Sequence, residues 1–384
     1  MTDGKRMIVH VFIGESSISL MVIENIIKHS ACDNFFIVTK KADAQKYREL
    51  FKKYRTGNFV LCDEVKPSFL SKAITRVSSV IFGRLSPLFT YFPYDEIRTI
   101  FRYRKNPILL HGISFSFIAH LLLLNHFQSF SHVCWGYVPK PSGKNIKSKL
   151  LFLLRRSLFR GYKRIGCLMT EDKTDFETLY GITVATTIPY QSDILNYNDP
   201  QVLQIQPVPG RRKVILGNSA CYTDSYLKLL PVLERIAAPA SITCMLSYPD
   251  NDTTGGKKEV IEKFTFAFGG EFTPWTQQLD MENYAEKMKQ HDIYICNVDR
   301  QTGLFAIYIM LMYGKKLYLT GKNLAWIREN NFIVHDVNQL ETETSETFQT
   351  LLGLEERKHN HERILDMLSP AALANEWDIF YLQL

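Results

Sequence analysis

The sequence lacks the patterns that mark several common protein classes. Its seven cysteines stand singly at positions 32, 62, 134, 167, 221, 244 and 296, without a CxxC pair, so neither a zinc knuckle nor a disulfide framework is indicated. No apolar run reaches the roughly 18 residues that a membrane-spanning helix needs. The start, MTDGKRMIVHVFIGESS, has neither the apolar core nor the cleavage site of a signal peptide. These absences predict a cytoplasmic protein in a reducing compartment.

Acidic residues are absent from two long stretches. Residues 66–94 carry four basic side chains among many aromatic and aliphatic ones, and residues 140–164 carry nine basic residues. In the second stretch the apolar and basic positions alternate at the spacing of an amphipathic helix. Both stretches suit an anionic membrane surface, and a helix packed on the core with a basic outer edge is the alternative. No recognised DNA-binding motif accompanies the charge, so we expect no nucleic-acid partner.

What is present describes a globular protein with more than one core. The chain has 384 residues, of which 46% are hydrophobic and 22% charged, and its formal net charge is +7. A chain of this length usually divides into two domains. We predict an N-terminal domain over residues 1–195 and a C-terminal domain over residues 210–368. Residues 369–384 form an amphipathic helix that is expected to return to the first domain.

The first half reads as a doubly wound α/β domain. A strand from Met7 to Ile13 is followed by a loop, a helical pattern and a second strand. In such a fold, the loops after the strands face the ligand. His10 and Glu15 are therefore candidates for chemistry, and His111 and Trp135, near the ends of later strands, are candidates for lining the cleft. The competing interpretations are packed histidines, a solvated or helix-capping Glu15 and a core tryptophan. Thr170 is expected to cap a further helix.

In the second half, residues 294–321 (YICNVDRQTGLFAIYIMLMYGKKLYLTG) predict strand, polar loop, buried helix and strand. Gly314 is expected to end the helix. The helix begins after Arg300, Gln301, Thr302 and Gly303, where unpaired N–H groups carry partial positive charge. With Arg300 beside it, this helix start suits a diphosphate. An ordinary buried crossover helix is the equally weighted alternative.

Two other loops are expected near the same edge of the second sheet. Gly217, Asn218 and Ser219 follow its first strand, where a glycine lets a ligand approach the backbone. Tyr248 lies in a loop after the next strand. The first loop is not GxGxxG, so no nicotinamide site is predicted. The sequence thus indicates two Rossmann-like domains facing across a cleft.

Several short motifs, in order along the chain, resemble one family. They are VHVFIG at 9–14, HG at 111–112, WG at 135–136, LRRSLFRGYKRIGCLMT at 154–170, ILGNS at 215–219, YPDN at 248–251 and RQTG at 300–303. Together with the SP…W of the last helix, they make the chain similar to glycosyltransferase family 56. These enzymes are the TDP-N-acetylfucosamine:lipid II N-acetylfucosaminyltransferases of the GT-B class.

The resemblance implies a dTDP-sugar donor of the 4-acetamido-4,6-dideoxyhexose type and a polyprenyl-diphosphate-linked saccharide acceptor. It also implies peripheral attachment to the inner face of the cytoplasmic membrane. The donor diphosphate would sit against Arg300 to Gly303 and Gly217 to Ser219, with Tyr248 at the base or sugar. Glu15, or less favourably His111, would serve as the base, with His10 and Trp135 at the acceptor. No DxD pair appears in these loops, so no metal or other cofactor is expected.

Two further functions remain open at this point. The chain could be a GT-B binding or scaffold protein without catalysis. It could also be a sugar-nucleotide 2-epimerase, which shares the two-domain layout but does not need basic lipid-facing patches.

Overall fold

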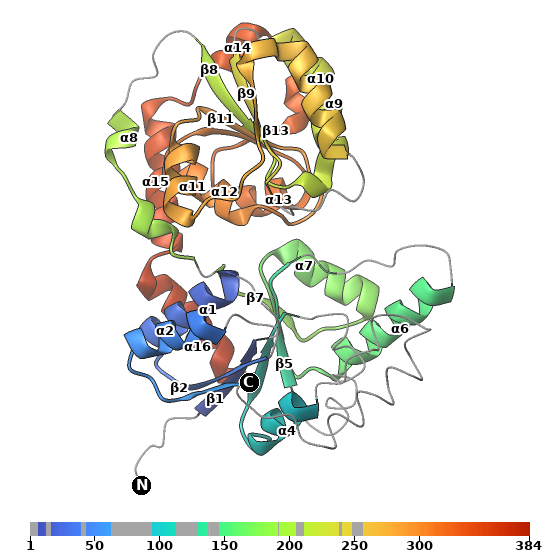
Figure 1. Cartoon of the computed structure of the whole chain (residues 1–384), viewed down its shortest axis with the longest axis vertical. Helices are drawn as coiled ribbons and strands as arrows, with labels where there is room; N and C mark the ends of the chain where they lie inside the picture. The colour runs from blue at the N-terminus through green and yellow to red at the C-terminus, as the bar shows by residue number, and fades with distance from the viewer. Residues whose placement is uncertain are drawn as a thin grey trace. The chain divides into compact units, whose positions relative to one another are not determined.

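The computed structural model describes residues 7–12, 17–39, 44–62, 94–112, 130–136, 138, 146–190, 192–204, 211–237, 240–247 and 256–384. The chain divides into two compact units. Unit 1 comprises residues 1–192 and 370–384, and unit 2 comprises residues 193–369. Residues 66–93 of the first basic stretch and the candidates Glu15 and Tyr248 lie outside the described residues. Both units are drawn in Figure 1.

Unit 1 contains a seven-stranded parallel sheet in the order β3-β2-β1-β4-β5-β6-β7. The strands are β1 (Met7–Phe12), β2 (Asp33–Val38), β3 (Phe59–Leu61), β4 (Ile108–His111), β5 (Phe130–Cys134), β6 (Ile165–Cys167) and β7 (Ala185–Thr187). Its described helices are α1 (Ser17–His29), α2 (Ala44–Lys53), α4 (Tyr94–Arg102), α6 (Ile146–Gly161), α7 (Thr170–Asp175), the π-turn η3 (Phe176–Tyr180) and α16 (Pro370–Leu382).

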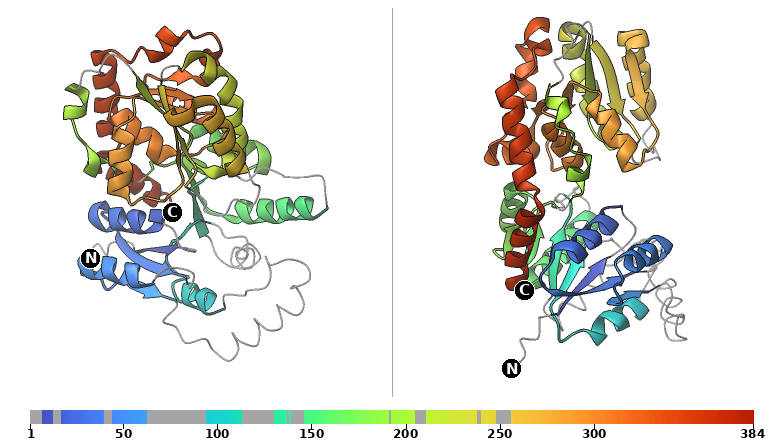
Figure 2. Two further views of the ribbon diagram at one scale, coloured as in Figure 1. Left: turned by 45° about the horizontal axis from the view of Figure 1, so that its top comes forward. Right: turned by 90° about the vertical axis from the view of Figure 1, so that its left-hand side faces the viewer.

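Alternation along β1 explains how this sheet is covered. Val9 and Val11 belong to one buried cluster, and Phe12 belongs to a second cluster with residues of α1 and α2. Successive side chains of a strand point to opposite faces, so both faces of β1 are packed. The terminal helix α16 contacts α1 within unit 1, and Figure 2 shows the two helices from further directions.

Unit 2 contains a six-stranded parallel sheet in the order β10-β9-β8-β11-β12-β13. Its strands are β8 (Arg212–Leu216), β9 (Ala240–Met245), β10 (Phe272–Trp275), β11 (Ile293–Cys296), β12 (Lys316–Leu319) and β13 (His335–Asp336). Its helices are α8 (Gln201–Gln204), α9 (Thr223–Ile236), α10 (Gly256–Phe268), α11 (Met281–Lys289), α12 (Leu304–Met312), α13 (Gly321–Glu329), α14 (Ser345–Gln349) and α15 (Leu354–Met367). Single 3₁₀ turns are η4 (Ile194–Tyr197), η5 (Ala220–Tyr222), η6 (Gly269–Glu271) and η7 (Val337–Glu341).

Helices cover both faces of the second sheet. In Figure 1, α9 and α10 lie together on one side, and α11, α12 and α15 lie on the other. Strands 214–216, 242–244 and 293–295 supply alternate residues to the cluster under α9 and α10. The predicted pair of doubly wound parallel domains is therefore confirmed.

Helix α12 ends as its sequence predicts. Gly314 has φ of +61°, its N–H donates to the Leu311 carbonyl at 2.9 Å, and the Lys315 N–H donates to the Met310 carbonyl at 3.0 Å. This pair of bonds is a Schellman motif, which satisfies the last carbonyls of the helix. All but one residue of this helix are buried, as expected of a crossover helix under a second layer.

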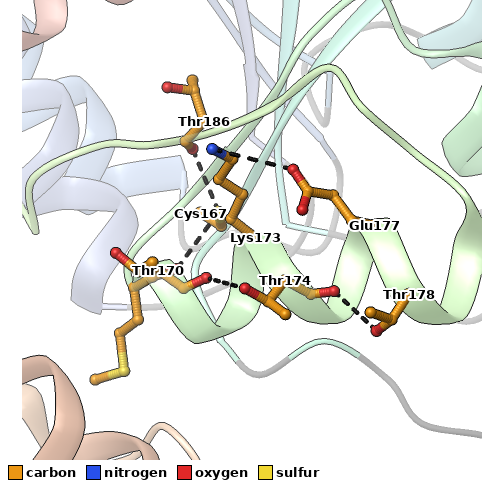
Figure 3. A network of polar contacts seen from close by, with 8 residues as sticks. Cys167, Thr170, Lys173, Thr174, Glu177, Thr178 and Thr186 are labelled. Carbon is orange, nitrogen blue, oxygen red and sulfur yellow. Dashed lines mark hydrogen bonds and ion pairs between the residues drawn. The ribbon is translucent and has the colours of Figure 1, made fainter.

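The start of α7 differs from the prediction. The residue that caps it is Met169, which provides no side-chain capping bond, and Thr170 is the first helical residue. Figure 3 shows that hydroxyls in this region bond back along the helix: Thr174 Oγ1 donates to the Thr170 carbonyl at 3.1 Å, and Thr178 Oγ1 donates to the Thr174 carbonyl at 2.8 Å. Such back-bonding competes with the main-chain ladder, and the next turn, η3, is a π-turn.

The seven cysteines are free thiols. Within the described part of the chain, no helix combines the length and the apolar character needed to cross a bilayer.

Among the described residues of unit 1, three histidines are buried, and burial lowers the pKa of each. It lowers the pKa of His10 to about 4 and that of His132 to about 3, and it lowers that of His111 as well. Below pH 6.5 the histidines of the unfolded chain therefore bind protons, whereas those of the folded unit stay neutral. The free energy of unfolding consequently falls as the pH falls.

We expect unit 1 to lose about 1.4 kcal/mol per pH unit for each of these histidines below pH 6.5. The near-ultraviolet circular dichroism, followed from pH 7 to pH 4, should report loss of tertiary structure. His132→Gln should lower the proton uptake on unfolding by about one. A flat stability profile between pH 7 and pH 4 would contradict this account.

Candidate functional site

The strongest candidate site lies at the carboxyl ends of β8 and β11, which are neighbours in the sheet of unit 2. The loop after β11 leads into α12 through Gly303, which has φ of +65° and provides no side-chain cap for the helix. The N–H groups of the first turn of a helix lack partners within the helix and carry partial positive charge. This end of α12 therefore attracts an anion.

The structure brings the two predicted loops together. Asn218 Nδ2 donates to Thr302 Oγ1 at 2.9 Å, although 84 residues separate them. A Cβ at position 303 would lie 3.0 Å from Asn218 Cγ, so only glycine fits here without displacing the amide. Asn218 and Thr302 are thus held at the start of α12, beside Gly303.

Arg300 is attached to the first loop as well. Its Nη2 donates to the hydroxyl of Tyr222, and its guanidinium lies over the Tyr222 ring, 4.9 Å from the centroid. A guanidinium stacked on an aromatic ring keeps its charge and loses little further freedom when it binds a ligand. Tyr222 therefore positions a cation next to the helix start.

Two amide oxygens near this site have no hydrogen-bond partner among the described residues. They are Asn218 Oδ1 and Gln301 Oε1, and Gln301 is only 7% exposed. A buried acceptor without a donor is costly, so a ligand hydroxyl or N–H that reaches these atoms would gain free energy. The amide nitrogens of the same side chains suit phosphate oxygens.

Gly217 and Ser219 shape the backbone of the first loop. Gly217 has φ of +65°, and a Cβ there would lie 2.3 Å from the hydroxyl of Tyr226. That hydroxyl lies 2.7 Å from the Met245 carbonyl, to which it donates, and it accepts the Ser219 N–H at 3.3 Å. The hydroxyl of Ser219 accepts the Cys221 N–H at 3.1 Å, so it caps the turn η5.

The sequence analysis did not identify Asn323, which supports the loop between β11 and α12 through the main chain of Thr302. Its side chain is fully buried in α13. Oδ1 accepts the Thr302 N–H at 3.3 Å, and Nδ2 donates to the Thr302 carbonyl at 3.0 Å. The neighbouring Gly321 permits this approach, because a Cβ there would lie 2.1 Å from Asp299 Oδ1. The sequence signal that could have pointed to this role is the spacing of Gly321 and Asn323 directly after the strand β12.

Replacing Asn323 by leucine should destabilise unit 2 by about 2–4 kcal/mol, because both main-chain groups of Thr302 lose their buried partner. Urea unfolding monitored by tryptophan fluorescence measures the change. The matched control is Asn196→Leu, at an exposed position of the same unit, for which less than about 0.5 kcal/mol is expected. Equal effects of the two substitutions would remove the supporting role of Asn323.

In unit 1 the structure joins His10 and His111. His10 Nε2 lies 2.9 Å from Asn34 Oδ1, and His10 Nδ1 lies 3.0 Å from His111 Nε2. Asn34 Nδ2 donates to the Cys32 carbonyl, which fixes the amide so that its oxygen faces His10. His10 therefore carries its proton on Nε2 and accepts from His111 Nε2–H.

This arrangement leaves the proton of His111 on Nε2 and a lone pair on Nδ1. Nδ1 is buried and has no hydrogen-bond partner among the described residues. The ring stacks on Phe12 at 4.2 Å and on Trp135 at 5.8 Å between centroids. Burial lowers the pKa of His111, so the ring is neutral at pH 7.

The surroundings of His10 favour a structural role as a packed histidine, and they do so more strongly than the surroundings of Trp135 favour a core role for that residue. His10 has no exposed surface and meets the edge of Tyr381 in α16 at 5.6 Å. Trp135 is half-buried and stacks on Trp377 of the same helix at 6.0 Å. A half-buried indole can still contact a ligand, whereas the fully buried His10 can influence a ligand through its bond to His111.

Comparison with known proteins addresses the fold. No family model matches the chain. Anabaena HepE in complex with UDP superposes with a TM-score of 0.66, over 99% of this chain and 100% of that one, at 10% identity. A glycosyltransferase from Rickettsia africae gives a TM-score of 0.64, over 98% of each chain, at 12% identity.

A third similar structure is the UDP-GlcNAc 2-epimerase from Neisseria meningitidis bound to UDP-GlcNAc. It gives a TM-score of 0.52, over 98% of this chain and 99% of that one, at 12% identity. At such identities the likeness concerns the fold. With its two parallel α/β units, the chain has the GT-B fold.

Proposed function

We propose that this protein is a glycosyltransferase that holds the diphosphate of a nucleotide sugar in unit 2. The observation that carries the proposal is the contact of Asn218 with Thr302 at the start of α12, in a GT-B fold. It joins two loops at one point beside an arginine and a helix N-terminus, which together suit a diphosphate. The similar HepE structure contains UDP, which agrees with a nucleotide ligand.

The proposed donor is a dTDP-sugar of the 4-acetamido-4,6-dideoxyhexose type. The proposed acceptor is a polyprenyl-diphosphate-linked saccharide used in bacterial surface polysaccharide synthesis. Both follow from the motifs that resemble glycosyltransferase family 56, among them RQTG at 300–303 and ILGNS at 215–219. Tyr248 is proposed to contact the base or sugar.

In the proposed reaction an acceptor hydroxyl oxygen bonds to the anomeric carbon while the bond from that carbon to the diphosphate breaks. Arg300 and the α12 N-terminus stabilise the charge that develops on the departing diphosphate, without a metal. A side chain of unit 1 takes the hydroxyl proton, and Glu15 is the preferred base.

His111 is the second candidate base because its Nδ1 lone pair is unpaired among the described residues. Its low pKa makes it a weaker proton acceptor at pH 7. We assign His10 a positioning role through its bond to His111, and we assign Trp135 to acceptor contact.

Saturation-transfer NMR with dTDP and UDP tests donor binding directly. We expect saturation transfer to dTDP, which Arg300→Ala abolishes. Saturation transfer to UDP but not to dTDP would indicate that the donor's nucleobase is uracil and not thymine. Absence of transfer to both nucleotides would favour a binding or scaffold protein without catalysis.

A screen of nucleotide sugars, with and without polyprenyl-linked acceptors, tests the reaction. Transfer to a polyprenyl-linked acceptor supports the proposal. The likeness to an epimerase supplies the second candidate function. Conversion of UDP-GlcNAc to its 2-epimer without an acceptor would identify that activity and end the proposal of transfer.

Helix α6 supports the proposed attachment to the inner face of the cell membrane. Ile146, Leu150 and Leu153 are 85%, 55% and 57% exposed, and their spacing places them on one face of the helix. The same helix and the residues after it are rich in lysine and arginine and contain no acid. Exposed apolar side chains flanked by cations suit the surface of an anionic bilayer.

The double variant Leu150→Asp/Leu153→Asp should lose at least tenfold in affinity for vesicles that contain an anionic phospholipid, as measured by co-sedimentation. Phe266→Asp is the matched control, because Phe266 is 94% exposed on α10 of the other unit. Equal binding by the wild-type protein and the double variant would contradict attachment through α6.

A further inference from the structure

Unit 2 contains a cavity that the proposed transfer reaction does not use. It has a volume of about 170 Å³. Its lining residues come from the ends of several helices and strands and include Lys289 of α11, Asp292, Gly314, Lys315 and Arg357 of α15. Lys315 and Lys316 stand at the amino end of β12, whereas the candidate nucleotide site lies at the carboxyl ends of the strands. The two sites therefore occupy opposite edges of one sheet.

The cavity, which we call the basic cavity, is lined by four cations and one carboxylate. The cations are Lys289, Lys315, Lys316 and Arg357, and the carboxylate is Asp292. Asp292 already accepts the main-chain N–H of Lys213 at 3.0 Å. Asp292 is one carboxylate facing two cations of the cavity, Lys315 and Arg357.

Three of these cations are held in place by neighbouring groups. Lys289 pairs with Asp199 at 3.3 Å and with Glu286 at 2.7 Å, so its charge is compensated. Lys316 Nζ donates to the carbonyls of Thr347 at 2.9 Å and Phe348 at 3.1 Å, and the carboxylate of Glu343 favours its charge.

Arg357 is held by packing and by a bond to the main chain. Its Nη2 donates to the Val202 carbonyl at 2.8 Å. Gly314 lets α15 approach, since a Cβ there would lie 2.9 Å from Arg357 Cβ. The bond to Val202 and the packing against Gly314 place Arg357 at the cavity wall.

Lys315 is the cation whose ammonium forms no hydrogen bond with any described residue. The charged groups that face it are Asp292 before β11, Arg357 on α15 and Lys289 on α11. The pKa of Lys315 is lowered to about 8, chiefly by burial; Asp292 opposes this shift, and Arg357 and Lys289 contribute to it. An added anion would relieve this repulsion and restore the full charge on Lys315.

We propose that the basic cavity binds a small phosphate or diphosphate anion, at a site separate from the donor site. Arginine and lysine are the side chains that recognise phosphate oxygens, and here Arg357 and Lys315 both line the cavity. A space of about 170 Å³ holds several water molecules, since one needs about 10–15 Å³. An inorganic diphosphate fits in their place.

Isothermal titration with inorganic diphosphate tests the proposal in the Arg300→Ala background, where the donor site is disabled. We expect one bound diphosphate per chain at pH 7. Lys315→Met in the same background should weaken binding at least tenfold, and Lys258→Met, on the exposed surface of α10, should not change it. Absence of binding to the Arg300→Ala protein, or equal affinity with Lys315→Met, would overturn the proposal while leaving the proposed transfer reaction untouched.

Proton linkage provides a second readout. Because diphosphate stabilises protonated Lys315, binding at pH 8 should take up a fraction of a proton, seen as a heat that depends on the buffer's ionisation enthalpy. The affinity should fall as the pH rises above 8. Lys315→Met should reduce the proton uptake relative to the protein that retains Lys315, because any proton exchange of diphosphate itself is common to both. Without ligand this substitution should raise the melting temperature by a few degrees, because a repelled ammonium is removed. Proton uptake that is unchanged in Lys315→Met would place the anion elsewhere.

Discussion

Arg300→Ala should lower kcat/KM for the nucleotide sugar by about 10²–10³ while the protein stays folded. The guanidinium lies over Tyr222 and is bonded to its hydroxyl, so it is a positioned charge beside the start of α12. Removing it leaves only the helix dipole to compensate the departing diphosphate. Steady-state kinetics with dTDP-sugar and a polyprenyl-linked acceptor measure the loss.

Two comparisons separate charge from geometry at this position. Arg300→Lys keeps the charge but loses the forked donors and the stacking, so an intermediate activity is expected. Arg328→Ala, on the exposed surface of α13, removes an arginine from the same unit and should leave the kinetics unchanged. Wild-type rates for Arg300→Ala with an intact circular dichroism spectrum would remove the site from this loop.

Gly217→Ala should destabilise unit 2 by about 3 kcal/mol or more and abolish nucleotide binding. The position has φ of +65°, which costs an alanine about 1–2 kcal/mol. Its Cβ would also lie 2.3 Å from the Tyr226 hydroxyl, which holds Ser219 and the Met245 carbonyl in the buried core. Either the loop or the tyrosine must move, and both support Asn218. Urea unfolding gives the stability change.

Gly270→Ala serves as the control for the glycine substitution. A Cβ at position 270 would meet nothing within 4 Å, so a change below about 0.5 kcal/mol is expected. If Gly217→Ala were equally mild and still bound dTDP, the close approach of Tyr226 would not govern this loop.

Local patterns in the sequence predicted the elements of the fold and the edge where the site lies. The buried run before Gly314 predicted α12, which the structure confirms together with its glycine ending. The two doubly wound parallel domains followed from strands that alternate with helical patterns. The prediction that Thr170 caps α7 was wrong, because the helix begins one residue earlier than a side-chain cap would place it.

Contacts between distant side chains could not be predicted in the same way. His10 was a candidate for acceptor binding because it lies in the first strand. The structure buries it under Tyr381, which comes 371 residues later in the chain. No periodicity within β1 reveals what covers it. Asn323 and Tyr222 were missed for the same reason, since each acts on a loop that is remote in sequence.

The sequence by itself determined the helices, the parallel strands and the loops that carry Arg300 and Asn218, because these depend on the side chains of neighbouring residues. Only the tertiary structure decided that Asn218 meets Thr302, that Asn323 holds the loop, and that cations from separate elements surround one cavity. The physical reason is that strand order and helix packing set such distances. Strand order and helix packing depend on the simultaneous burial of many residues, and a short sequence motif does not contain this information.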